Sequence, residues 1–305
     1  MGEFSKLVGD YGEDIVSHFL NIFGWENHAT NKYVDCHTRK HEKNTHGIDA
    51  LFVYNSPLES KTIENVIVSS KYSSNPYSKV ASTFKSHFED IATAIECYAK
   101  SSLKKEINQQ VISAGRYNGC KKVDTGVLFY INNDSNPDKQ DIISSIKNSQ
   151  ISSDLKYRTI HVVDNKRASF LYESITYIKN KYGYDKVNFF YPPTSLNLTI
   201  TGKRYFGKVF PVEYISSPII PFVIERGNQE QPIICLVSSE PFSADGIEHL
   251  LSCTRDLIAD ISKNLLFVFS HYNKLNAKED LDRLRLSLDR EISIEIDSYN
   301  ADFRG

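Results

Sequence analysis

Three charged residues near the start of this chain fall on three successive elements that the sequence predicts. They are Glu13 in a helix over residues 5–23, Asp49 at the start of a strand over residues 48–54, and Lys71 at the end of a strand over residues 63–71. Side chains two residues apart in a strand point to the same face of a sheet, so Ser69 and Lys71 project together. Asp49 projects beside them if the two strands pair. We therefore expect a sheet whose neighbouring strands bring a carboxylate and a lysine to one face.

These side-chain types suit the hydrolysis of phosphodiester bonds. Such hydrolysis uses a hard divalent cation held by oxygen ligands, together with a cationic group that orients water or helps to deprotonate it. Glu13, Asp49 and the backbone carbonyl of Ser70 are the candidate metal ligands, and Lys71 is the candidate cationic group. Helical spacing places Glu13 in line with apolar and small residues, so we expect this carboxylate to be half-buried. The alternative is a surface glutamate that pairs with Lys6.

A known nuclease superfamily is similar to this chain in three short runs. The runs are Gly9-x-x-Gly12-Glu13-Asp14, Gly47-x-Asp49 and Ser69-x-Lys71. They resemble the PD-(D/E)xK, or restriction-endonuclease-like, superfamily, and the first run looks most like its Holliday-junction-resolvase and Mrr-like members. The resemblance extends over about residues 1–180, the size of one domain. It implies a catalytic set formed by Glu13, Asp49, Lys71 and the Ser69 position. It also implies bound Mg²⁺ or Mn²⁺, DNA as the substrate, and a role in restriction or anti-phage defence.

Ser69 departs from the family pattern, because the superfamily usually carries a carboxylate at this position. Some restriction enzymes of the superfamily have Ser-x-Lys on the strand and take the missing glutamate from the helix that follows. The helix predicted over residues 80–108 offers Glu89, which would then be a metal ligand. The other interpretation is a site without this ligand. In that case the protein is a catalytically weakened DNA-binding or scaffold subunit that keeps the nuclease fold.

The remaining pattern predicts an α/β fold in two parts. Further strands are predicted over residues 27–34, 125–132 and 158–163, and further helices over 140–148 and 168–181. Later strands over 222–225, 233–237, 265–270 and 292–297 alternate with helices over 243–263 and 278–288. We expect a restriction-endonuclease-like αβββαβ core in residues 1–187, a linker with a β-hairpin in 188–220, and a smaller α/β domain for partner binding or sensing in 221–305.

Length and composition favour a cytoplasmic enzyme. A chain of 305 residues exceeds the usual size of one core, which supports two domains. No run of about eighteen apolar residues is present, so we expect no membrane partner. The five cysteines are scattered without a Cys-x-x-Cys pair, which is typical of reduced thiols in a cytoplasm.

Contacts with DNA would depend on basic residues gathered on one face, because the net charge of −2 is not that of a dedicated nucleic-acid-binding protein. The candidates are His46, Lys79, Lys104, Lys105, Arg116, Lys121 and Lys122. A solvated helix end, whose lysines complement the helix dipole, is the alternative. Cutting both DNA strands needs two sites, so we expect a homodimer or a hetero-oligomer with a second defence protein.

The segment between the first two strands contains Cys36, His37, His41 and His46. Cysteine and histidine are good zinc ligands, so a small metal-binding loop is one interpretation. The spacing matches no standard zinc finger, and the segment is rich in Lys, Arg, Glu and Asn. We therefore predict an exposed loop in which His46 reaches the catalytic site, where its imidazole could contact a phosphate or water.

Overall fold

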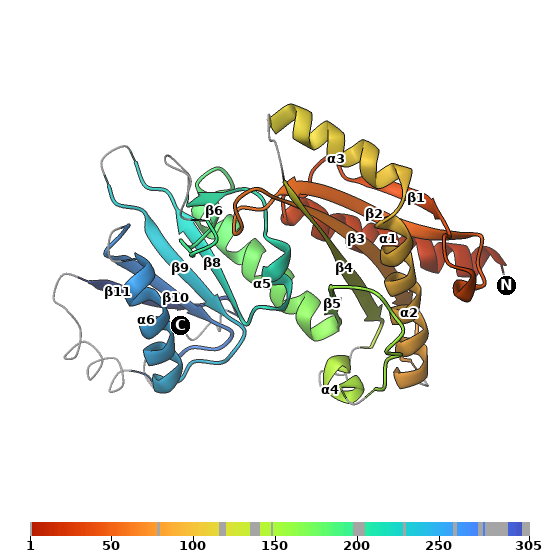
Figure 1. Ribbon diagram of the computed structural model, residues 1–305. Coiled ribbons are helices and arrows are strands. Elements are labelled where there is room, and N and C mark those ends of the chain that lie inside the picture. The colour runs from red at the N-terminus through yellow and green to blue at the C-terminus, as the bar shows by residue number, and fades with distance from the viewer. Residues whose placement is uncertain are drawn as a thin grey trace. The chain divides into compact units, whose positions relative to one another are not determined.

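The computed structural model divides the chain into two compact units, residues 1–169 and residues 170–305 (Figure 1). The structure describes residues 2–77, 80–115, 120–134, 141–147, 149–197, 205–227, 230–258, 261–273, 277 and 292–300. The boundary between the units falls inside α5 (Asn165–Tyr182), whereas the sequence placed the end of the first domain at residue 187. None of the described helices combines the length and the apolar composition that a membrane crossing requires.

The first unit contains a five-stranded sheet with the order β1-β2-β3-β4-β5. Its elements are α1 (Gly2–Ile22), β1 (Ala29–Asp35), η1 (Arg39–His41), β2 (Thr45–Asn55), β3 (Thr62–Ser73), α2 (Val80–Tyr98), α3 (Ser102–Gly115), β4 (Lys121–Asn132), α4 (Ile142–Ile146) and β5 (Thr159–Val163). Strand β2 is antiparallel to both of its neighbours, β1 and β3, whereas β3, β4 and β5 run parallel to one another. The predicted αβββαβ order of α1, β1, β2, β3, the following helix and β4 is confirmed.

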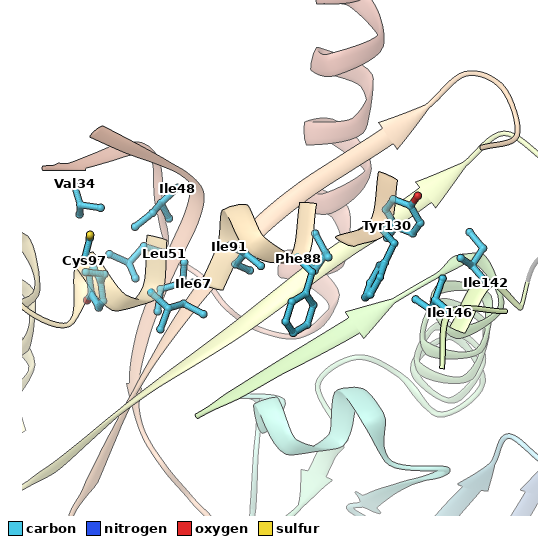
Figure 2. Close-up of a cluster of buried hydrophobic side chains, with 14 residues drawn as sticks. Val34, Ile48, Leu51, Ile67, Phe88, Ile91, Cys97, Tyr130, Ile142 and Ile146 are labelled. Carbon is cyan, nitrogen blue, oxygen red and sulfur yellow. The ribbon is translucent and has the colours of Figure 1, made fainter. Parts of the chain in front are cut away.

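Helices α1 and α2 cover opposite faces of this sheet. Phe129 of β4 contacts Phe19 of α1, with ring centroids 5.4 Å apart, while the next residue, Tyr130, contacts Phe84 of α2 at 5.7 Å. Successive side chains of a strand point to opposite faces, so these two contacts lie on opposite sides of the sheet. A strand covered on both sides is expected to be apolar throughout, which explains the continuous apolar run at the centre of β4. A cluster of buried apolar side chains fills the α2 side and includes Ile91 of α2 (Figure 2).

The helix predicted over residues 80–108 is two helices in the structure, α2 and α3. Ser101 explains the break. Its hydroxyl donates to the carbonyl oxygen of Tyr98 at 2.8 Å and accepts from the backbone N–H of Lys104 at 3.1 Å. A serine that accepts from the N–H three residues later is an N-cap, so it ends one helix and begins the next.

The second unit contains a six-stranded sheet with the order β11-β10-β9-β8-β6-β7. Its elements are β6 (Val187–Phe190), β7 (Phe206–Gly207), η3 (Val212–Ser216), β8 (Ile219–Ile224), β9 (Ile233–Ser238), α6 (Ala244–Ile258), β10 (Asn264–Phe269) and β11 (Ser293–Ser298). The segment expected to be a linker therefore contributes β7, η3 and part of β6 and β8. The helix predicted over residues 278–288 lies outside the described residues. Two α/β units confirm the predicted fold class.

Candidate active site

Strand pairing brings Asp49 opposite Ser69. Strands β2 and β3 are antiparallel with Ala50 paired to Val68, and continuing this register by one residue pairs Asp49 with Ser69. Directly paired residues of antiparallel strands project to the same face. In addition, the backbone N–H of Ser70 donates to Asp49 Oδ2 at 2.6 Å, which fixes the carboxylate against β3. The sequence predicted this neighbourhood from the two-residue period of the strands.

A pocket of about 200 Å³ lies between α1 and the sheet. Its lining includes Glu13 of α1, Asp49 of β2 and Ser70 of β3. Two of the three candidate carboxylate and carbonyl ligands of a metal ion thus come from the strands and one comes from the helix. Glu13 is exposed, which differs from the half-buried position expected from its helical spacing.

A second pocket, of about 160 Å³, brings Asp49, Ser69 and Lys71 together. Asp49 lines both pockets, so it is the residue that they share. The end of β3, which carries Lys71, is held by Tyr77, because the Tyr77 hydroxyl lies 3.3 Å from the carbonyl oxygen of Lys71 and 3.2 Å from that of Ile131. This contact positions the backbone of the lysine at the pocket.

The carboxylate that α2 supplies to this second pocket is Asp90, not Glu89. Glu89 faces another part of the surface, where it lines a different cavity with residues such as Lys40, and its carboxylate lies 3.9 Å from Lys85 Nζ. Asp90 also lines that cavity, but successive residues of a helix differ by about 100° in direction, and only Asp90 reaches the pocket that contains Asp49 as well. The expected position of Glu89 beside Asp49 therefore differs from the structure, and Asp90 takes it. Asp90 also forms an ion pair with Lys43 at 2.5 Å.

His87 is a further residue beside this pocket that the sequence did not single out. Burial first, and then the nearby charge of Lys71, lowers the pKa of His87, while Asp90 acts in the opposite direction. Its Nδ1 atom is buried and has no hydrogen-bond partner among the described residues. A neutral imidazole therefore lies near the lysine and the aspartate. His87 precedes Asp90 by about one turn of α2, and this spacing is the sequence feature from which His87 could have been identified.

The predicted DNA-binding residues do not form one free basic patch. Lys104 forms a mostly buried ion pair with Asp124 at 2.5 Å, and Lys121 forms a more exposed ion pair with Glu59 at 2.6 Å. Burial raises the pKa of Asp124, although Lys104 acts to lower it. Lys105 and Lys122 are exposed, whereas Lys79 and Arg116 lie outside the described residues. Two lysines of the predicted set therefore have carboxylate partners instead of projecting freely into solvent.

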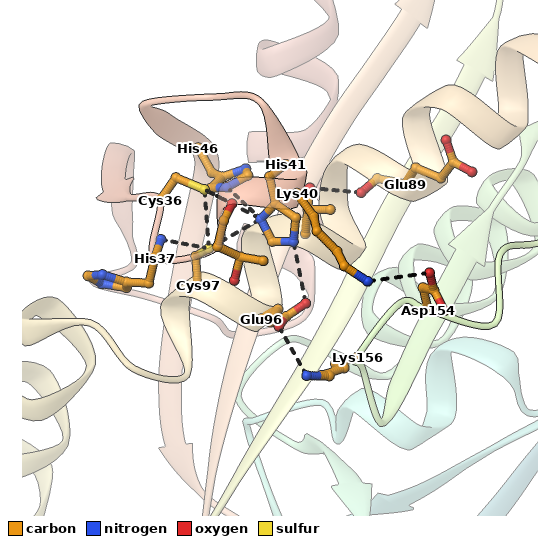
Figure 3. Close-up of polar contacts among 12 residues, drawn as sticks. Cys36, His37, Lys40, His41, His46, Glu89, Glu96, Cys97, Asp154 and Lys156 are labelled. Carbon is orange, nitrogen blue, oxygen red and sulfur yellow. Dashed lines mark hydrogen bonds and ion pairs between the residues drawn. The ribbon is translucent and has the colours of Figure 1, made fainter.

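Most residues between β1 and β2 are exposed, as predicted, but the potential metal ligands Cys36, His41 and His46 are not. His46 is 3% exposed, and Cys36 and His41 are partly buried. His46 lines the pocket that contains Asp49 and Lys71, and its Nε2 atom also lies 3.3 Å from His41 Nδ1. Cys97 of α2 completes the group (Figure 3). The sequence alone did not indicate that Cys97 belongs to this group, because Cys97 lies 61 residues after Cys36.

A five-stranded mixed sheet between two helices, in which Asp49 of β2 and Lys71 of β3 line one pocket, is the arrangement of a PD-(D/E)xK nuclease domain. The match to a family model places the chain more closely. The model described as the GAPS4 protein PD-(D/E)XK nuclease domain matches residues 1–167. The chain belongs to this family, which confirms the resemblance to the superfamily. Neither the curated proteins nor the solved structures include a significant match.

Proposed function

We propose that this protein is an Mg²⁺- or Mn²⁺-dependent DNA nuclease that hydrolyses phosphodiester bonds in restriction or anti-phage defence. One observation carries the proposal: Asp49 borders both the pocket that contains Glu13 and the pocket that contains Ser69 and Lys71. The order of these residues along the chain and the family match support the same conclusion. We place the nuclease activity in residues 1–187 and partner binding or sensing in residues 221–305.

The donor set supports a hard divalent cation. Glu13 and Asp49 offer carboxylate oxygens and Ser70 offers a backbone carbonyl oxygen, and oxygen ligands of this kind suit Mg²⁺ and Mn²⁺. We assign to Asp90 the place of the carboxylate that Ser69 lacks, because both residues line the pocket that contains Asp49. When bound, the cation would neutralise charge on the phosphate and make water a better nucleophile at neutral pH.

The residues of the chain supply orientation and charge. The N–H of Ser70 holds one oxygen of Asp49, and Asp49 lines both pockets. Lys71 lines the pocket that contains Asp49 and Ser69, where its ammonium group can orient the attacking water and stabilise the negative charge that develops on the phosphate. His87 stands near Lys71 as a neutral group that can accept a proton.

A cleavage assay tests this proposal. Purified full-length protein is incubated with supercoiled, linear, branched and single-stranded DNA in Mg²⁺, in Mn²⁺ and in EDTA. We expect cleavage only with a divalent cation, and we expect Asp49→Asn and Lys71→Ala to reduce it by about 100-fold or more. The thermal midpoint of Lys71→Ala should stay within a few degrees of the parent, as for a typical surface substitution. Full cleavage by pure Asp49→Asn protein would refute the assignment.

Neighbouring carboxylates of α2 provide a matched pair of variants. Asp90→Asn should raise the Mg²⁺ concentration needed for cleavage, because it removes a charged ligand from the pocket that contains Asp49. Glu89→Gln should behave like the parent, because Glu89 lines a different cavity. Equal effects of the two variants would contradict the assignment of Asp90.

The alternative is a weakened nuclease-fold subunit that binds DNA or serves as a scaffold, and Ser69 is the observation that favours it. In that case DNA binding without cleavage is expected in the same assay. Partner binding is tested separately by measuring the mass of the protein alone and with the products of neighbouring genes. We propose a homodimer or a hetero-oligomer with a second defence protein.

A further inference from the structure

Four potential metal ligands from four separate segments of the chain converge next to the candidate active site. Cys36 follows β1, His41 ends η1, His46 lies in β2 and Cys97 lies in α2. One atom from each side chain, a sulfur or a ring nitrogen, lies within 4.8 Å of the corresponding atom of every other member (Figure 3). Cys97 is fully buried and His46 is nearly so. We call this group the Cys2His2 cluster.

The distances within the Cys2His2 cluster agree with those around a tetrahedral zinc ion. Zn–S bonds of about 2.3 Å and Zn–N bonds of about 2.0 Å require S–S, S–N and N–N separations of about 3.8, 3.5 and 3.3 Å. The two sulfur atoms of Cys36 and Cys97 are 3.8 Å apart. His41 Nδ1 is 3.5 Å from each sulfur and 3.3 Å from His46 Nε2. Every one of these four separations fits one central ion.

A disulfide does not account for this geometry. A disulfide requires an S–S distance of about 2.05 Å, far shorter than the separation of Cys36 Sγ and Cys97 Sγ. Hydrogen bonding alone is also a poor explanation, because His41 Nδ1 lies within 3.5 Å of both sulfurs and of His46 Nε2, and a single ring nitrogen has only one proton or one lone pair to share. A cation at the centre satisfies all four groups at once.

The surroundings of the Cys2His2 cluster are those of a metal site. Glu96 Oε2 lies 3.4 Å from His41 Nε2, the ring nitrogen on the side away from the cluster, and Glu96 is itself buried. A carboxylate in this place fixes the tautomer and orientation of a histidine ligand. The backbone N–H of His37 donates to Cys97 Sγ at 3.4 Å, which stabilises negative charge on the sulfur.

We propose that Cys36, His41, His46 and Cys97 bind one Zn²⁺ ion with a structural role. Two sulfur and two nitrogen ligands select Zn²⁺ over Mg²⁺, and four protein ligands leave no open position for a substrate. The ion would join the ends of β1 and β2 to α2. Strand β2 carries Asp49, three residues after His46, and α2 carries Asp90, two helical turns before Cys97. The zinc site would therefore hold the two carboxylates in position without touching the substrate.

Metal analysis of the full-length protein tests the proposal. The protein is purified without chelators from cells grown with zinc, and its metal content is measured by mass spectrometry. We expect one zinc ion per chain. Cys97→Ser and His41→Asn should lower the zinc affinity by at least about tenfold. Their matched controls, Cys120→Ser and His37→Asn, should retain one ion, because neither residue belongs to the Cys2His2 cluster.

A second measurement uses the parent protein, so its outcome does not depend on whether a variant folds. The zinc of the parent protein is removed with a chelator under reducing conditions and replaced by Co²⁺. We expect the visible absorption of tetrahedral cobalt together with thiolate-to-cobalt charge-transfer bands. In a buffer that contains Mg²⁺ throughout, the thermal midpoint should fall when zinc is removed and recover when Zn²⁺ is added back. Failure of the reduced protein to take up Zn²⁺ or Co²⁺, or isolation with a Cys36–Cys97 disulfide in place of zinc, would overturn the proposal. Neither measurement contains DNA, so both test the zinc site independently of nuclease activity. A protein that binds zinc but does not cleave DNA would contradict only the proposed nuclease function.

Discussion

Replacement of Gly12 by alanine should separate α1 from the sheet and displace the candidate ligand next to it. A Cβ atom built on Gly12 would lie 2.6 Å from the Cβ atom of Tyr72 in β3. The Tyr72 Cβ is attached directly to the strand backbone, so rotation of the tyrosine ring cannot relieve the contact. Gly9 lies three residues earlier in the same helix, and a Cβ atom there would have no neighbour within 4 Å. Gly9→Ala is therefore the matched control.

The size of the effect follows from these distances. Carbon atoms in contact lie about 3.5–4.0 Å apart, so α1 must move by about 1 Å to accept the methyl group of Gly12→Ala. Overpacking of this kind costs about 1–3 kcal/mol, and the better helix propensity of alanine offsets about 0.5–1 kcal/mol of that. Gly9→Ala gains the propensity term alone. The two variants should differ by about 2 kcal/mol, which is about 4–8 °C in thermal midpoint for a unit of this size.

Gly12→Ala and Gly9→Ala should differ more in their rate of DNA cleavage than in their stability. A displacement of about 1 Å at a catalytic group can cost about 100-fold in rate, and Glu13 follows Gly12 directly. The assay measures the thermal midpoint by calorimetry and the initial rate of plasmid nicking at several Mg²⁺ concentrations, below the unfolding temperature of both variants. A Gly12→Ala protein as stable and as active as Gly9→Ala would refute the close packing of α1 on β3 and the role given to Glu13.

Three further outcomes are expected. Ser69→Glu should restore part of the plasmid nicking lost in Asp90→Asn, because it returns a carboxylate to the same pocket; no recovery would mean that the two positions are not equivalent. Burial, with a nearby arginine, lowers the pKa of His161 from 6.5 to about 4, so the unfolded chain binds the proton first as the pH falls. Urea unfolding should therefore show stability lost between pH 6.5 and about 4, by about 3 kcal/mol at most, and His161→Gln should reduce that slope. Burial acts to raise the pKa of Asp297, but hydrogen bonds from a lysine and from Tyr177 outweigh burial and lower this pKa. The stabilisation from Asp297 is therefore present above pH 3.8 and is lost as the pH falls through the lower pKa of the folded state. Asp297→Asn should remove this loss of stability at acid pH in the same experiment.

The sequence predicted the parts of the fold that depend on short periods. The alternation at Ser69 and Lys71 and the apolar centre of β4 follow from which sheet faces are covered, and both are visible over a few residues. The break between α2 and α3 was missed, because the apolar spacing continues through it. It depends on the hydroxyl of Ser101, which can cap a helix or lie within one, and packing decides between the two.

The sequence predicted only the part of the candidate site that depends on the pairing of β2 with β3. Asp49 opposite Ser69 requires no more than the pairing of β2 with β3. The choice between Glu89 and Asp90 depends on the rotation of α2 about its own axis, which the packing of the whole helix sets. The Cys2His2 cluster depends on contacts between residues far apart in the chain, and a spacing rule built on zinc fingers does not include them.

The contacts of Asp90 explain how a carboxylate from α2 can serve a site that lacks one on β3. Without a cation, Asp90 pairs with Lys43, and both side chains are nearly half exposed, at 45% and 47%. Ion pairs with this exposure contribute about 0–1 kcal/mol, because water screens them. A divalent cation that binds Asp49 and Asp90 together would therefore displace Lys43 at little cost. Once displaced, Lys43 remains beside the same pocket as a positive charge available to the phosphate, so loss of the ion pair is compatible with substrate binding.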